Sequence, residues 1–249
     1  CGDGGPSLEF GFITPRLMGQ LHETGNWQIR SQAIAELQRV SSQLSPEQQV
    51  LVAPHIVALL DFLMGLLDDS NFKISLTSLH IISDFLDRFA EQVKTTALGA
   101  GEELLRRLME KFADNKIVLR QQTLRVMKKL LEKLTSERGL RLLLPYVHHA
   151  NSHIREQAIN VLIQALLAAP SQPSELYRSL LSTLVQALDD VKPKVKLVAL
   201  EGIAVLHAAM GGGAFEAQRR DVGLSAALGQ QVDERLQQGR GTLPTMSND

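Results

Sequence analysis

The sequence predicts an all-α fold in which pairs of helices stack into a solenoid. Three observations support this prediction. A short pattern recurs five times along the 249 residues, its apolar positions are spaced as on one face of an α-helix, and no region alternates apolar and polar residues long enough to form a sheet. With 44% hydrophobic and 21% charged residues, the chain has the composition of a folded protein with a substantial core.

The repeated pattern begins with an apolar residue, here called the anchor, which a basic residue usually follows. Its first copy reads Ile29-Arg30, then Ala33-Ile34, with Leu37 three residues later. The five anchors are Ile29, Ile74, Leu119, Ile154 and Val195. They are 45, 45, 35 and 41 residues apart, around the ~40–47 residues of HEAT and armadillo repeats.

Each repeat is predicted as a first helix, a short loop and a second helix that contains the anchor. The first helices correspond to the amphipathic runs Leu17–Leu21, Val50–Leu67, Glu102–Phe112, Leu140–Val147 and Leu176–Leu188. Short polar residues, whose side chains cap free N–H groups, stand before the second helices at Asn26, Asn71, Asp114 and Asn151. The fifth loop has Pro193, which is tolerated at a helix start.

One more helix is predicted after the fifth repeat. The glycines after Met210 should end the last repeat helix and loosen the chain. Apolar residues then recur every four positions, as Leu224, Leu228, Val232 and Leu236. This stripe predicts a single C-terminal helix that caps the array of five helix-loop-helix repeats.

The array is predicted to form one domain, residues 12–238, between a flexible leader (1–11) and a disordered tail (239–249). The chain starts without Met and without the layout of a signal peptide, and Cys1 is its only cysteine, so no internal disulfide can form. We therefore expect a soluble, intracellular, monomeric domain of a longer multi-domain protein.

Motifs for catalysis, cofactors and metals are missing from the sequence. No phosphate-binding loop and no Ser-based catalytic pattern is found. His149 and His153 have the spacing of zinc ligands on a helix, but they span a predicted loop and lack the partnering Glu. The sequence therefore predicts a protein that is not an enzyme and that binds neither metal nor cofactor.

Nucleic acid and membranes are also unlikely partners on composition. The 26 Lys and Arg residues are balanced by 27 Asp and Glu, and only 4% of residues are aromatic, which leaves little for phosphate attraction or base stacking. The longest apolar run, Val50–Leu67, contains Pro54, His55 and Asp61 and makes a poor membrane span.

The five predicted loops show a gradient when they are aligned on their anchors. Two residues before the anchor stand Trp27, Phe72, Ile117, Ser152 and Pro193, and one residue before it stand Gln28, Lys73, Val118, His153 and Lys194. Because the loops of a solenoid lie along one edge, they should form a continuous strip. One end of this strip is apolar, and the other, with Lys192, Lys194 and Lys196, is basic.

Each of these features has a purely structural alternative. Trp27 and Phe72 could fold back on their own helices as hydrophobic staples. The basic residues after the anchors, Arg30, Arg120, Arg155 and Lys196, could reach an acidic side chain or a carbonyl of a neighbouring repeat. The three lysines could belong to a solvated loop, although a helix N-terminus disfavours cations.

The repeats, with Asn26-Trp27-Gln28-Ile29-Arg30 in the first loop, Ser70-Asn71-Phe72-Lys73-Ile74 in the second and a lysine-rich fifth loop, resemble a TOG domain. The resemblance covers roughly Phe12 to Leu236 and is nearer to the CLASP and crescerin types, above all to the ciliary crescerins. In two respects the chain departs from that family: it shows five repeats and one terminal helix instead of six repeats, and its fourth loop is only weakly basic.

The resemblance implies that the loops bind the αβ-tubulin heterodimer, the early ones β-tubulin and the late ones α-tubulin, in a microtubule regulator of the cilium or axoneme. Carried over by position, the implied contact residues are Asn26, Trp27, Arg30, Phe72, Lys73, Lys116, Ile117, Arg120, His153, Arg155, Lys192, Lys194 and Lys196. The alternative is a HEAT-repeat scaffold that binds another protein through its helical faces and has no affinity for tubulin.

Overall fold

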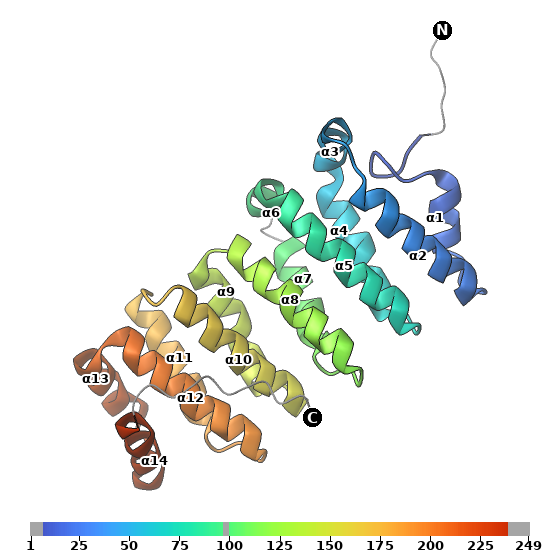
Figure 1. Ribbon diagram of the computed structural model, residues 1–249. Helices are drawn as coiled ribbons and strands as arrows, with labels where there is room; N and C mark the ends of the chain where they lie inside the picture. Colours follow the sequence, from blue (N-terminus) through green and yellow to red (C-terminus); the bar gives the residue numbers. More distant parts are fainter. Residues whose placement is uncertain (1–6, 97–99, 239–249) are drawn as a thin grey trace. The chain divides into compact units, whose positions relative to one another are not determined.

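The computed structural model describes residues 7–96 and 100–238 (Figure 1). Regular structure in these residues consists of α-helices and short 3-10 helices, with one isolated β-bridge between Glu9 and Ile13. The predicted tail and the first six residues of the predicted leader lie outside the described residues. The all-α prediction is confirmed.

The chain divides into two compact units, Cys1–Leu134 and Thr135–Asp249. The first unit contains α1 (Pro15–Leu21), α2 (Trp27–Ser42), α3 (Pro46–Val52), α4 (Ile56–Gly65), α5 (Phe72–Arg88), α6 (Ala90–Thr96), α7 (Ala100–Lys111) and α8 (Ile117–Lys133). The second contains α9 (Ser136–Leu143), α10 (Ser152–Ala168), α11 (Ser174–Ala187), α12 (Pro193–Met210), α13 (Gly212–Val222) and α14 (Ala226–Gln237).

In the first unit the second helices of three repeats, α2, α5 and α8, pack side by side, with α1, α4 and α7 packed against them (Figure 1). The centre of this unit is aromatic. Phe85 of α5 is fully buried between the rings of Phe12 and Phe89, at centroid distances of 6.3 and 5.6 Å. Phe10, placed by the sequence in a flexible leader, lies with its ring centroid 5.9 Å from that of Phe62 in α4.

The predicted helix over Val50–Leu67 is broken. It forms α3, a 3-10 turn at Ala53–His55, α4 and a second 3-10 turn at Leu66–Asp68, because Pro54 has no N–H to continue the first helix. Pro46–Asp68 is long and apolar enough to cross a membrane by length and composition alone. Within it, 39% of the most apolar window is buried, including Leu59 and Leu63 in the core of the first unit.

In the second unit α10 and α12 pack side by side, and α11 packs against α12. The close approach of α11 and α12 depends on Gly202, since a Cβ atom there would lie 3.1 Å from the nearest side-chain carbon of Leu184. Of the five anchors in both units, Ile74, Leu119, Ile154 and Val195 are buried, whereas Ile29 at the start of the array is half-buried.

Two helices, α13 and α14, follow the fifth repeat, where the sequence predicted one. Gly211, with φ of 80°, ends α12 as predicted, but the chain enters α13 at once and does not loosen, since Gly212 and Gly213 adopt helical conformations. Phe215 of α13 is fully buried, with its ring edge-on to His207 at 5.0 Å. The pair therefore adds a sixth helix-loop-helix unit, which removes one of the two departures noted above.

We expect Phe215→Ala to lower the free energy of unfolding by about 3–5 kcal/mol, the usual cost of removing a fully buried phenylalanine. Urea denaturation measures this loss, with Ala217→Ser, on the exposed part of the same helix, as the matched control. A loss below about 1 kcal/mol would mean that this segment is as loose as its glycines suggested.

Candidate functional site

Four of the five intra-repeat loops share one backbone arrangement. The residue five positions before the anchor accepts a hydrogen bond from the backbone N–H of the residue three positions before it. The acceptors are Asp69, Asp114, His149 and Asp190, and the donors are Asn71, Lys116, Asn151 and Lys192, at 2.8–3.1 Å. These loops therefore present the first turns of their second helices in the same way.

The predicted asparagine caps are confirmed. Asn26 accepts hydrogen bonds from the N–H groups of Gln28 and Ile29, and Asn71 and Asn151 each accept one from the residue two positions further on. Asp114 is not the cap of the third loop. The cap position there is held by Lys116, and in the fifth loop by Lys192, without a side-chain capping bond in either case.

The first turns of α2, α5 and α8 expose apolar side chains. Trp27 is 56% exposed and Phe72 38% exposed, so Trp27 is not a staple folded onto its own helix. Ile117 is exposed as well, together with Val118, which was not among the predicted contacts. We call Trp27, Phe72, Ile117 and Val118 the apolar surface of the first unit.

Two contacts bring the loops of this surface together. A guanidinium nitrogen of Arg30, behind the first loop, lies 3.2 Å from a carboxylate oxygen of Asp69 in the second. The ammonium group of Lys116 in the third loop lies 5.6 Å from the centre of the Phe72 ring, a cation–π contact. In agreement, the N-terminal ends of α2, α5 and α8 point the same way in Figure 1.

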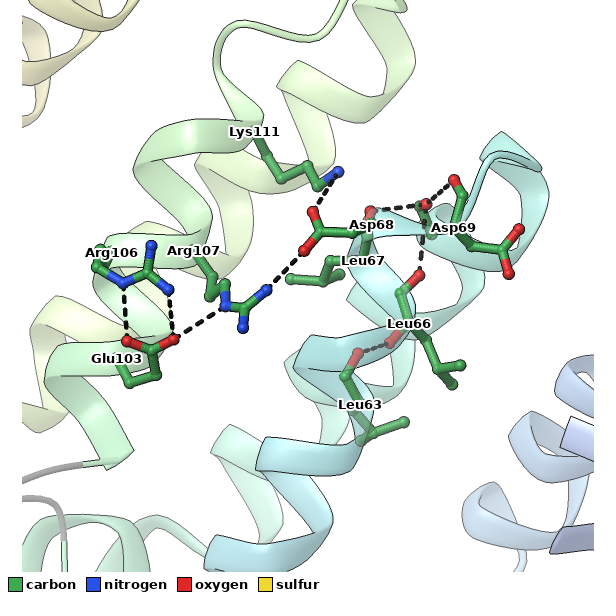
Figure 2. Close-up of polar contacts among 11 residues, drawn as sticks. Leu63, Leu66, Leu67, Asp68, Asp69, Glu103, Arg106, Arg107 and Lys111 are labelled. Carbon is green, nitrogen blue, oxygen red and sulfur yellow. Dashed lines mark hydrogen bonds and ion pairs between the residues drawn. The ribbon is translucent and has the colours of Figure 1, made fainter. Parts of the chain in front are cut away.

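The base of the second loop is held from two sides (Figure 2). The hydroxyl of Ser75 in α5 donates to the carbonyl of Leu67, at 2.9 Å. From the other side, the Asp68 carboxylate pairs with Arg107 and Lys111 of α7, at 2.6 and 3.1 Å. These contacts hold the segment that precedes Phe72 and Lys73 in place.

Arg107 also bonds to Glu103, as Figure 2 shows. Hydrogen bonds from Arg106 and Arg107 lower the pKa of Glu103 to about 2. The carboxylate of Glu103 therefore remains charged, and orients Arg107 towards Asp68, at any physiological pH.

The three arginines among the predicted contacts make structural bonds. Arg155 pairs with Asp190 through two hydrogen bonds of 2.6 and 2.8 Å, and the two side chains are only 12% and 9% exposed. Arg30 pairs with Asp69 across the first two loops through one terminal guanidinium nitrogen, at 3.2 Å, and Arg120 donates to the backbone carbonyl of Asp114. The geometry therefore favours the structural alternative for all three.

The fourth and fifth loops form a second, basic surface, which comprises His153, Lys192, Lys194 and Lys196. All four side chains are exposed. The hydrogen bonds from Arg155 hold the pKa of Asp190 below its usual range, with smaller contributions from the Lys192 N–H and the charge of Lys196. The carboxylate of Asp190 is thus paired with Arg155, whereas the adjacent Asp189 is exposed.

Two exposed apolar residues of this region were missed by sequence reasoning. Val191, within the fifth loop, is 84% exposed, and Leu197, on the second turn of α12, is 56% exposed. Aligning the positions four residues before and two residues after the anchor would have shown that they are apolar, but not that they are exposed. Among the described residues, no group of three His, Cys, Asp or Glu side chains could hold a metal ion.

The structure is thus a stack of helix pairs that presents apolar and basic side chains on its intra-repeat loops, the architecture of HEAT-repeat protein-binding domains. The CLASP N-terminal family matches residues 14–209, and the chain belongs to this family of TOG domains. Membership confirms the resemblance inferred from the loops and the expectation that the chain is not an enzyme.

Among relatives of known name, the human TOG array regulator of axonemal microtubules protein 1 is 34% identical over 212 residues, or 83% of this chain. The crescerin-like protein che-12 of Caenorhabditis elegans is 24% identical over 199 residues, or 80% of the chain. The chain spans only 12% and 15% of the length of these relatives.

Solved structures agree with the assignment. A crescerin TOG domain, from an array that regulates microtubules in the primary cilium, matches with a TM-score of 0.74 and 30% identity, over 96% of this chain and 95% of that one. The third TOG domain of Drosophila melanogaster Mini spindles matches with a TM-score of 0.71 and 18% identity, over 95% and 99% of the two chains. The second match supports the fold alone.

We expect Arg155→Met to destabilise the second unit by about 3 kcal/mol at pH 7, because it leaves the Asp190 carboxylate buried without its partner. Since the pKa of Asp190 is lowered in the folded state, the pair stabilises fully above the unfolded pKa of about 3.9 and is lost as the pH falls through the lower folded value. Urea denaturation from pH 7 to pH 3 should therefore show the difference between variant and wild type shrinking below about pH 4. A difference that stays constant with pH would contradict this account.

Proposed function

We propose that this domain binds the αβ-tubulin heterodimer through its intra-repeat loops and serves in a regulator of microtubules. One observation carries the proposal. Most of the large apolar side chains that are exposed in the described residues lie on these loops or on the first two turns of the helices after them. Within each unit, exposed apolar groups on the loops and first helical turns are typical of a site of protein contact.

The two surfaces suit different parts of an acidic partner. In the apolar surface, Trp27 supplies a large, rigid contact area, and Lys73 and Lys116 add positive charge beside it. The basic surface of the second unit offers mainly charge. By analogy with the family, we assign the apolar surface to β-tubulin and the basic surface to α-tubulin.

The contact residues proposed from the sequence fall into two groups in this assignment. Trp27, Phe72, Lys73, Lys116, Ile117, His153, Lys192, Lys194 and Lys196 present exposed side chains and meet tubulin directly. Asn26, Arg30, Arg120 and Arg155 act through the loops that they cap or hold. Val118 joins the direct contacts.

The mechanism is mass action. Lysines at the rim of an interface accelerate association with an oppositely charged partner, and a buried aromatic side chain slows dissociation. A regulator that holds a dimer near a growing end raises the local tubulin concentration. Because named relatives regulate axonemal microtubules and act in the primary cilium, we place this domain in a ciliary or axonemal protein.

Gel filtration of the purified chain with purified tubulin tests the proposal directly. Co-elution of the two proteins supports it. If the chain does not bind tubulin by gel filtration or by co-sedimentation with microtubules, the proposal is wrong, and a HEAT-repeat scaffold that acts through its helical faces takes its place.

We expect Trp27→Ala to weaken tubulin binding by about 2 kcal/mol, roughly a factor of 30, because the indole is an exposed aromatic contact. The melting temperature should stay nearly the same. Val50→Ala is the control, since Val50 is an exposed apolar residue on α3, which follows the opposite end of α2. A large fall in melting temperature would instead make Trp27 a structural residue.

We expect reversal of Lys192 and Lys194 to Glu to slow association with tubulin, and the loss to shrink as salt rises, because the Debye length is only about 8 Å at physiological ionic strength. Stability should hold or rise slightly, as acidic residues suit a helix N-terminus. Stopped-flow association at low and high salt measures the effect. Lys128→Glu with Arg178→Glu makes the same change in charge on exposed positions of α8 and α11. Equal rates for the loop variant and this control at low salt would remove the fifth loop from the site.

A further inference from the structure

The fifth repeat has two exposed apolar side chains, Val191 in its loop and Leu197 on the second turn of α12. Val191 is 84% exposed, the highest value among the exposed large apolar residues of the described chain, and Leu197 is 56% exposed. In the sequence they stand on either side of the lysines of the basic surface. Exposing two large apolar groups to water is unfavourable unless a partner covers them.

The local structure of the loop does not call for Val191. In the other four loops the equivalent position, four residues before the anchor, is held by Gly25, Ser70, Asn115 and Ala150. Small and polar residues suit a turn, whereas a β-branched residue favours a strand. The shape of the fifth loop is already fixed through Asp190, which accepts the Lys192 N–H and pairs with Arg155.

Leu197 lies on the outward face of α12. It follows Pro193 by four residues and Lys194 by three, so these side chains are neighbours on the helix surface. The buried face is formed by Val195, Val198 and Ala199. At the equivalent position two residues after the anchor, three of the other four repeats have a polar residue, namely Ser31, Gln121 and Glu156.

We propose that Val191 and Leu197, which flank Lys192, Lys194 and Lys196 in the sequence, add apolar contacts to the basic surface. The surface then fits a protein partner that presents an apolar side chain among carboxylates. This inference rests on the proposed function, in which that partner is tubulin, and it changes the fifth loop from a purely electrostatic contact into an amphipathic one.

The two kinds of contact differ in their response to salt. Rim lysines act mainly on the association rate, and salt screens them. Buried apolar area acts mainly on the dissociation rate, and moderate salt leaves it unchanged. The contribution of Val191 and Leu197 can therefore be separated from that of the lysines within one loop.

The test compares Val191→Ser/Leu197→Gln with wild type in binding to purified tubulin at low and high salt. We expect about tenfold weaker binding at both salt concentrations, with faster dissociation and little change in association. Leu167→Ser, at an exposed apolar position near the end of α10, is the matched control and should bind like wild type. The melting temperatures of all variants should agree, since neither side chain is buried.

Each contrary outcome has a distinct meaning. If wild type binds tubulin and the double variant binds equally well, this inference is wrong and the proposed function stands. A loss that disappears at high salt also overturns it, because the residues would then act through the lysines. If wild type does not bind tubulin, both this inference and the proposed function are wrong. Should the double variant melt lower, Val191→Thr keeps the shape of the side chain, and it must still weaken binding for the inference to hold.

Discussion

The pairing of an arginine with an aspartate of the next loop is the interaction on which the candidate site depends. Arg30 meets Asp69 in the first unit, and Arg155 meets Asp190 in the second. Each aspartate also accepts a backbone N–H of its own loop, so one carboxylate fixes both the shape of that loop and its distance from the loop before it. The exposed side chains around the pair can then be apolar or cationic, because they do not have to hold the loop in place.

Because some residues hold the loops in place and others are exposed, the loops can carry exposed side chains that lower the stability of the fold. A tryptophan and a phenylalanine stand in water at the first turns of α2 and α5, and lysines stand at the start of α12, where the helix dipole repels them. Asparagine caps and buried carboxylates provide the local stability that these residues do not. Residues that lower local stability in this way are typical of functional positions.

The two surfaces differ in the physical basis of recognition. On the apolar surface, Lys116 lies against the ring of Phe72, so charge and apolar area belong to one cluster. On the basic surface, Asp190 is paired with Arg155, and the exposed Val191 and Leu197 flank the three lysines in the sequence. Both surfaces therefore combine charged side chains, which salt screens, with apolar side chains, which it does not, in different proportions.

The sequence by itself determined the repeat, the helical class, the asparagine caps and the chemical character of the loops, because helix periodicity and capping are local properties. It also predicted that Trp27 and the lysines lie on the intra-repeat loops or the first turns of the following helices, where the structure exposes them. Only the tertiary structure decided what the arginines do, since the partner of Arg155 is 35 residues away in the chain. The same holds for α13, whose glycines suggest a break until Phe215 is seen in the core, and for Val191, whose exposure depends on what the neighbouring repeat leaves uncovered. Burial and ion pairing are properties of packing between repeats, and a single repeat does not encode them.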